Sequence, residues 1–231
     1  MSASLLAGCG SSTQQGGAAA SSEASASITA AADGEEDNII RVGVVCSMTG
    51  GSAIYGEGAQ NAIDMAVEEI NGGDSGYKIE IVNGGKVADD AKDAKQAMNA
   101  YNKVMADSPE AIVGSFFSSV TLPMAEQASK DGMLLLATGA TNADVTLKGD
   151  TIFRNCFIDP YQGEKMANYA VEKLSAKTAA VFYQTGNDYS EGLMNAFVEK
   201  AAELGLEIVD TEAFAEGDKD FKAQMTNIAA A

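Results

Sequence analysis

Three turns that are rich in hydroxyl groups and glycine follow apolar runs of the chain. The segment VGSFFSSVTLP (113–123) leaves its apolar run at Ser118 and Ser119, while SMTGG (47–51) and TGATN (138–142) follow two others. N–H groups at the start of a helix are unpaired and the helix dipole favours negative charge, so a serine placed there can help to bind a carboxylate. A threonine hydroxyl and a backbone carbonyl suit an ammonium group, which only donates hydrogen bonds. Polar groups at such positions either cap the next helix or hold a ligand, so these turns are candidates for a binding site.

The two serines of the first turn have different predicted roles. Either could serve as the N-cap of the helix predicted over 120–131, because a serine side chain there accepts a hydrogen bond from a free backbone N–H. Ser119, directly before that helix, is interpreted as the plain N-cap. Ser118 is interpreted as the ligand contact, because Thr141 and Tyr55 are expected on the same rim.

Apolar β-branched runs alternate with amphipathic segments from Ile39 onward, which is typical of βαβ units. We expect strands at 39–47, 77–83, 111–117 and 133–137, with helices within 59–73, 89–107 and 120–131. Such units form a doubly wound parallel sheet that binds ligands beyond the carboxyl ends of its strands, at the switch point in strand order. The hydroxyl-bearing turns all lie at such ends, so they should converge on one rim.

The alternation restarts after a crossing near residues 151–160. Helices are expected at 161–174, 192–204 and within 218–231, and strands at 178–183 and 206–210. Two strands are too few to cover these helices, so we expect the beginning of a second α/β lobe without its remainder. The predicted organisation is a signal remnant and flexible linker over 1–38, a first ligand-binding α/β lobe over 39–155, and a hinge crossing with an incomplete second lobe over 156–231.

Composition argues against several classes of function. The chain has 231 residues with 33 acidic and 15 basic side chains, so its formal net charge of −18 should repel nucleic acid and anionic lipid. It has no histidine, which argues against triad hydrolases and histidine-ligated metal centres. Cys9, Cys46 and Cys156 have no metal-ligand spacing. Cys46 and Cys156 are interpreted as small buried apolar residues, with a bridge between them left open. We expect no catalytic residue, metal or cofactor.

The first residues have the features of a targeting signal and a tether. LLAGC (5–9) resembles the lipobox of bacterial lipoproteins, in which the cysteine, here Cys9, is lipidated and becomes the mature N-terminus. Small and polar residues dominate from there to Ala32, which predicts a flexible linker. The alternative is an ordinary small-residue N-terminus with a chance cysteine. The basic region and most of the hydrophobic stretch of a signal peptide are missing, so we expect the sequence to start inside that peptide. No apolar run reaches about 18 residues, which leaves the lipid as the only expected membrane attachment.

Three stretches together resemble the leucine/isoleucine/valine-binding proteins, the type I extracytoplasmic solute-binding proteins of branched-chain amino-acid ABC importers. They are IRVGVVCSMTGGSAIYGEGAQNAIDMAVEEIN, IVGSFFSSVTLPMAEQASKDGMLLLATGATNADVT and VFYQTGNDYSEGL. The resemblance runs from Ile39 to the C-terminus and covers the first half to two-thirds of a family member. It implies a type I periplasmic-binding-protein fold whose two lobes close like a hinge around a free amino acid.

The resemblance assigns the two charged ends of that amino acid to two turns. Ser118, followed by Ser119, takes the position that grips the ligand α-carboxylate. Thr141 and the carbonyl of Gly139, with Ala140 between them, take the position that holds the α-ammonium.

Three further positions follow from the same resemblance. Tyr55 matches an aromatic residue that packs over the ligand side chain, and Tyr189 matches the one that closes over it from the second lobe. Asp159 lies where the chain crosses between lobes. The chain departs from the family at Phe117, where some members carry a disulfide-bonded cysteine. It also ends before the later segment from which members place a carboxylate against the ligand ammonium.

The expected function is that of an extracytoplasmic lipoprotein that binds a branched-chain or related amino acid and delivers it to an ABC permease without catalysis. As given, the chain is expected to bind weakly or not at all. The alternatives are a sensory ligand-binding domain and, less favoured, a nucleotide-binding α/β enzyme. Against the enzyme, GGSAIYGEG lacks the G-x-G-x-x-G spacing and the second strand ends at Asn83 rather than in an acidic residue. The sequence does not distinguish leucine from other aliphatic amino acids, amides or urea-like solutes.

Overall fold

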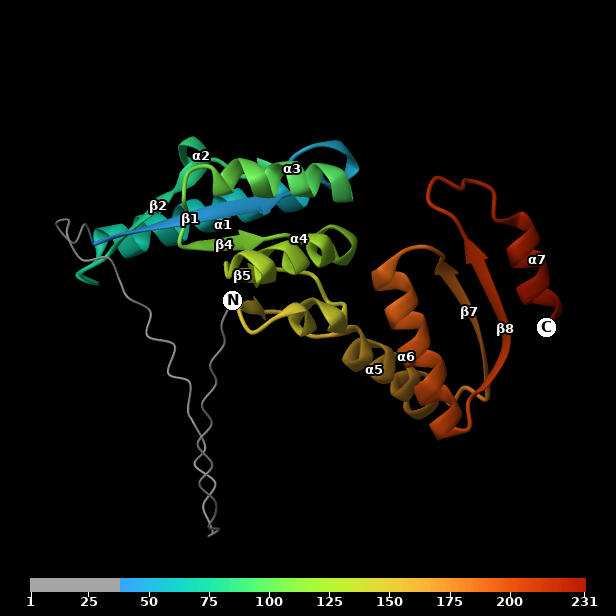
Figure 1. Cartoon of the computed structure of the whole chain (residues 1–231). Helices are drawn as coiled ribbons and strands as arrows, with labels where there is room; N and C mark the ends of the chain where they lie inside the picture. The colour runs from blue at the N-terminus through green and yellow to red at the C-terminus, as the bar shows by residue number, and fades with distance from the viewer. Residues whose placement is uncertain (1–37) are drawn as a thin grey trace, which may run out of the picture. The chain divides into compact units, whose positions relative to one another are not determined.

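The structure, a computed structural model, describes residues 38–231 (Figure 1). The predicted signal remnant and the lipidation site Cys9 fall on residues 1–37, and so does nearly all of the predicted linker, so these predictions lie outside the described residues. Within 38–231, strands and helices alternate as the pattern of apolar runs predicts. No helix in this range is both long and apolar enough to cross a membrane.

A six-stranded parallel sheet forms the centre of what we call the first lobe. Its strands are β1 (Ile39–Cys46), β2 (Lys78–Ile81), β3 (Ala88–Asp89), β4 (Ala111–Gly114), β5 (Leu134–Ala137) and β6 (Ile152–Arg154). They are ordered β2-β1-β4-β5-β6, and β3 pairs with the last two residues of β1. The chain places β2 on one side of β1 and β4 on the other, so the switch point lies between β1 and β4.

Helices cover both faces of this sheet (Figure 1). They are α1 (Ala53–Gly72), α2 (Val82–Gly85), α3 (Ala94–Met105) and α4 (Ser118–Asp131), with short 3-10 helices at Gly50–Ser52 and Ala143–Lys148. Side chains alternate between the faces of a strand. Val45 and Ile112 therefore join the core under α3 and α4, while Val44 and Cys46 lie in the smaller apolar cluster under α1.

A smaller parallel sheet forms the centre of what we call the second lobe. Its elements are α5 (Asp159–Glu172), β7 (Thr178–Gln184), α6 (Asp188–Leu204), β8 (Glu207–Phe214) and α7 (Lys222–Ala230). Helices α5 and α6 pack closely, because a Cβ added at Gly163 would lie 2.7 Å from the Cβ of Ala196. The ring of Phe221, at the start of α7, lies 5.4 Å from that of Phe214 in β8.

Four helices start earlier than predicted, and β4 ends three residues earlier than predicted. The helices begin at residues 53, 118, 159 and 188 instead of 59, 120, 161 and 192. Apolar periodicity marks only the turns that pack on a sheet, whereas the first turns of these helices carry many polar or small residues. Strand β4 ends at Gly114 instead of 117, because Gly114 has φ 127° and an added Cβ would lie 1.9 Å from the Val45 carbonyl oxygen.

The connection between the lobes runs from the end of β6 at Arg154 to the start of α5 at Asp159. The lobe boundary predicted at residue 155 falls within this connection. The lobe boundary itself stays a prediction.

Candidate functional site

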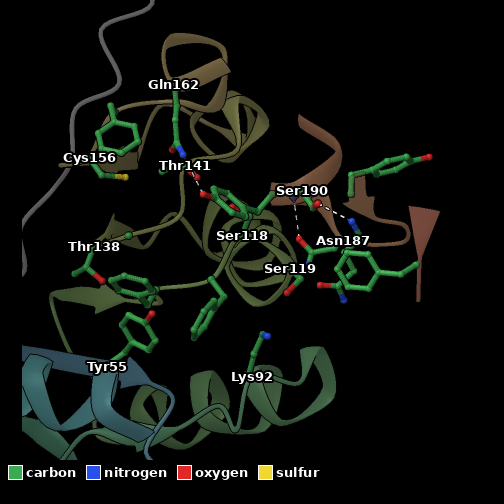
Figure 2. A pocket seen from close by; sticks show the side chains of 18 of the residues that line it. Tyr55, Lys92, Ser118, Ser119, Thr138, Thr141, Cys156, Gln162, Asn187 and Ser190 are labelled. Carbon is green, nitrogen blue, oxygen red and sulfur yellow. Dashed lines mark hydrogen bonds between the residues drawn. The ribbon is translucent and has the colours of Figure 1, made fainter. Parts of the chain in front are cut away.

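A cavity of about 610 Å³ lies where the turns after the strands of both sheets meet. Side chains from the two lobes line it together, as the labelled residues in Figure 2 illustrate. From the first lobe come Tyr55, Lys92, Phe116, Phe117, Ser118, Ser119, Thr138, Gly139 and Thr141. From the connection and the second lobe come Cys156, Phe157, Gln162, Phe182, Tyr183, Gln184, Asn187, Tyr189, Ser190 and Phe214.

A buried network of hydrogen bonds fixes the switch point. The carboxylate of Asp90, which is fully buried, accepts hydrogen bonds from the hydroxyls of Ser47 and Ser115. These serines follow β1 and β4, so one carboxylate ties together the two strands that flank the switch point. Asp90 also accepts the backbone N–H of Lys92 at 2.9 Å. The Ser115 hydroxyl in turn accepts the N–H of Phe116 at 2.7 Å, which holds the chain just before α4.

The start of α4 differs from the prediction for Ser119. The N-cap is Phe117, which provides no side-chain cap, and both serines lie inside the first turn. The interpretation of Ser119 as an N-cap is therefore wrong; Ser119 instead lines the cavity. Ser118 is almost buried, and its Oγ accepts the backbone N–H of Asn142 at 3.2 Å. This bond brings the turn that contains Thr141 next to the start of α4.

Arg154 holds the turn around Thr141 in place. Its guanidinium donates hydrogen bonds to the carbonyl oxygens of Ala140 (3.2 Å) and Asn142 (2.6 Å) and to the hydroxyl of Thr146 (2.9 Å). Gly139 packs directly on a ring, because a Cβ added there would lie 2.5 Å from the Phe116 side chain. The turn is therefore constrained from both sides.

Asp159 is a buried carboxylate beside this turn. Its backbone N–H donates to the carbonyl oxygen of Thr141 at 2.9 Å. The side chain is 1% exposed, and neither carboxylate oxygen has a hydrogen bond of standard geometry. Burial raises the pKa of the Asp159 carboxyl above its ordinary value of 3.8, while the Thr141 hydroxyl and the Arg154 guanidinium oppose that rise. A buried carboxyl group thus lies behind Thr141, with the Thr141 hydroxyl and the Arg154 guanidinium as its polar neighbours.

The two aromatic residues predicted for the site come from different lobes, Tyr55 from α1 and Tyr189 from α6. The Tyr55 ring lies against those of Phe116 and Phe117, with centroid distances of 4.5 and 5.3 Å. The Tyr189 hydroxyl accepts a hydrogen bond from the Gln162 amide at 3.2 Å.

Two polar contacts connect the lobes beside the cavity. The side-chain amide of Asn142 donates to the backbone carbonyl of Asp188, the first residue of α6, at 3.2 Å. Lys92 Nζ lies 3.8 Å from Oε1 of Glu216 and 5.1 Å from the centroid of the Phe117 ring. Lys92 therefore belongs to the wall of the cavity and to the contact between the lobes.

Most of the residues predicted for the site share this one cavity. Its lining includes Tyr55, Ser118, Ser119, Gly139, Thr141 and Tyr189. Ala140 and Asp159 are buried just behind the lining. Ligand contact by these residues stays a prediction.

Sequence reasoning missed the residues that hold the site in shape. Asp90 and Arg154 were not singled out, although each of these charged side chains forms hydrogen bonds in the folded chain to a hydroxyl-bearing turn. Lys92 and Gln162 were also missed, and so was Phe182. Nothing in their local spacing marks them, because their neighbours at the cavity are distant in sequence.

The two described cysteines form no bridge. Cys46 is buried as predicted, whereas the prediction of a buried Cys156 is wrong, because Cys156 is half-buried and lines the cavity. Both are free thiols. Burial and the nearby Asp90 carboxylate raise the pKa of the Cys46 thiol to about 11, so it is protonated at neutral pH. The described residues contain no cluster of side chains suited to a metal ion.

Known proteins resemble this chain over nearly all of its described part. Residues 39–231 match the sequence profile of a family described as periplasmic binding protein. Leu/Ile/Val-binding protein homolog 3 of Brucella melitensis is 34% identical over 195 residues, which cover 83% of this chain and 52% of that protein.

Two solved structures also match. The leucine-binding protein LivK of Thermotoga maritima has a TM-score of 0.75 and 32% identity, over 83% of this chain and 53% of that one. The substrate-binding protein LivJ of Streptococcus pneumoniae, in complex with isoleucine, has a TM-score of 0.74 and 32% identity, over 84% and 54%. The chain thus spans about half the length of the relatives it matches. These matches confirm the predicted fold class, and this chain belongs to the periplasmic binding protein family.

Proposed function

We propose that the chain captures a free amino acid with an apolar side chain, and does so as the solute-binding component of an ABC importer. The observation that carries this proposal is the meeting of Ser118 and Thr141 at one cavity. We assign the start of α4 at Ser118 to an anionic group and the turn at Thr141 to a cationic group. The names of its relatives indicate branched-chain amino acids as the ligand class. The solute is bound and released unchanged.

The α-carboxylate binds at the start of α4. The first backbone N–H groups of this 14-residue helix have no intrahelical partner, and the positive end of the helix dipole lies at this terminus. The hydroxyls of Ser118 and Ser119 can donate to the same oxygens. The Asn142 N–H bond to Ser118 Oγ leaves that hydroxyl proton free to donate outward.

The α-ammonium binds at the neighbouring turn. The Thr141 hydroxyl and the Gly139 carbonyl provide acceptors, and Arg154 fixes the backbone that presents them. The buried carboxyl group of Asp159 lies behind Thr141. Burial disfavours its ionised form, so an ammonium group bound at this turn would stabilise the carboxylate.

Closure of the lobes completes binding. Tyr55 contacts the ligand side chain from the first lobe and Tyr189 from the second. A ligand that contacts both lobes favours the closed state over the open one by its extra contacts. The permease then recognises the closed state. Cys9, outside the described residues, carries a lipid that anchors the chain at the outer face of the membrane.

Calorimetry with the free amino acids at high concentration tests this proposal, because weak binding is expected of a chain that spans about half the length of its relatives. Ser118→Ala should weaken binding at least about tenfold, because a hydrogen bond to a charged group contributes roughly 1.5–3 kcal/mol. Ser75→Ala, at an exposed loop remote from the cavity, is the matched control and should bind as the parent does. The proposal fails if Ser118→Ala binds every ligand as tightly as the parent.

A further inference from the structure

Aromatic rings from both lobes line the cavity. The Tyr55, Phe116 and Phe117 rings form a three-ring cluster in the first lobe. In the second lobe the Phe182 ring lies 4.9 Å from the Phe214 ring, measured between centroids. The chain has seven tyrosines, eight phenylalanines and no tryptophan, and eight of these fifteen rings line this cavity. The walls are therefore far richer in rings than the chain as a whole.

Several of these rings keep uncovered surface. Tyr55 is 44% exposed, Tyr189 41% and Phe182 37%. Large apolar groups at a concave site with this much open surface mark a place where an apolar group binds. The open rings come from both lobes, so a flat group between the lobes can contact rings on both of its faces.

The charges at the cavity exclude a cationic side chain. Lys92 is the only charged residue among the described residues that line the cavity, and no carboxylate belongs to that lining. A ligand with an ammonium or guanidinium side chain would meet the Lys92 ammonium, and no carboxylate of the lining would offset the repulsion. An anionic side chain would compete with Glu216 for Lys92. The rings that make up much of the lining favour an apolar side chain.

We infer that the cavity selects an amino acid with an aromatic side chain, phenylalanine or tyrosine, over leucine, isoleucine and valine. The inference rests on the proposed amino-acid binding and narrows its ligand class. Aliphatic and aromatic side chains both gain from the removal of apolar area from water. Paired rings gain further stabilisation from edge-to-face and offset geometry, so contact with a ring cluster on each side favours an aromatic ligand.

Calorimetry on the full chain with L-phenylalanine, L-tyrosine and L-leucine tests the inference. We expect phenylalanine to bind about tenfold more tightly than leucine, which corresponds to about 1.4 kcal/mol. Leucine binding as tightly as phenylalanine, or more tightly, overturns the aromatic preference and leaves the proposed function standing. If none of the free amino acids binds, the proposed function falls and the inference falls with it.

Phe182→Leu and Tyr55→Leu sharpen the test, because each keeps an apolar side chain and removes one ring. Each should weaken phenylalanine binding about tenfold and leucine binding by a smaller factor, because leucine loses only apolar contact whereas phenylalanine also loses a ring pair. Tyr77→Leu, which removes an exposed ring outside the cavity, is the control and should change neither affinity. Thermal unfolding of each variant identifies loss of fold. An equal loss of affinity for both ligands in the folded variants contradicts the inference.

Discussion

The first lobe packs Val45, Ile112 and Leu135 completely between its sheet and helices. In the second lobe, buried apolar side chains are confined to alanines and Leu206, and Phe182 of its sheet is exposed. The same contrast holds at the cavity. The first lobe fixes its part of the site through buried hydrogen bonds to Asp90 and through partly buried hydrogen bonds that Arg154 donates. The second lobe contributes rings that are partly exposed, such as Phe182 and Tyr189.

This difference indicates that the two lobes have different roles in ligand binding. The groups proposed to bind the charged ends of the ligand are held in place before the ligand arrives, which lowers the entropic cost of binding. The groups proposed to contact its side chain lie partly on the less packed lobe, which can adjust as the lobes close.

The largest expected effect contrasts the two cores. Ile112→Ala, at a fully buried position of β4, should lower the free energy of unfolding by about 2–5 kcal/mol. Ile208→Ala, at a half-buried position of β8, should lower it by only about 1 kcal/mol. Urea denaturation followed by circular dichroism measures both. Equal losses would show that the lobes are equally well packed.

The next comparison concerns the ties between strand ends and helix starts. Asp90→Ala leaves two buried serine hydroxyls without their acceptor and should destabilise the chain by roughly 3 kcal/mol. Ser190→Ala, whose hydroxyl accepts the Gln184 N–H in the second lobe, should cost about 1 kcal/mol. Asp74→Ala, at an exposed loop, is the control and should stay within about 0.5 kcal/mol of the parent. If the Asp90 variant is as stable as this control, the hydrogen bonds to Asp90 do not hold the first lobe's part of the site in place.

Hydrogen exchange compares the two sheets without mutation. Helices α3 and α4 cover β4 and β5. The backbone amide hydrogens of these two strands should therefore exchange only when the whole lobe unfolds. Amides of β7 and β8 should exchange faster, by about tenfold or more, because their sheet is partly open to solvent. Mass spectrometry after timed labelling distinguishes the sheets. Slower exchange in β7 than in β4 would reverse the comparison.

The smallest expected effect is the pH dependence that Asp159 introduces. Its pKa is raised in the folded state, so between 3.8 and the raised value the folded chain binds more protons than the unfolded chain. The free energy of unfolding should therefore fall as pH rises through that window. Asp159→Asn removes the titrating group, so the parent should lose stability relative to this variant above pH 3.8. Urea midpoints measured from pH 3.5 to 7 give the difference, and parallel curves would contradict it.

Much of the fold could be predicted from the sequence, because buried parallel strands leave a strong local pattern. The apolar runs that begin at Ile39 and at Ala111 predicted β1 and β4, and Gly132 and Gly205 end α4 and α6 in the left-handed conformation. The starts of helices were less predictable. Polar first turns such as that of α6 at Asp188 carry no apolar period.

The candidate site could be predicted only in part. Ser118 and Thr141 follow strands, so their position marks them, and the resemblance to known binding proteins added Tyr55 and Tyr189. The role of Asp90 could not be predicted, because its two serine partners lie 43 and 25 residues away in the sequence. Its role depends on strand order, which local spacing does not encode.

The central claim is that the cavity binds both charged ends of a free amino acid. Calorimetry with phenylalanine, its α-amide and its N-acetyl derivative tests this claim, because the amide lacks the carboxylate and the acetyl derivative lacks the ammonium. The account predicts binding of phenylalanine and a loss of at least about tenfold for each derivative. Derivatives that bind as tightly as the free amino acid, or a free amino acid that does not bind, would contradict it.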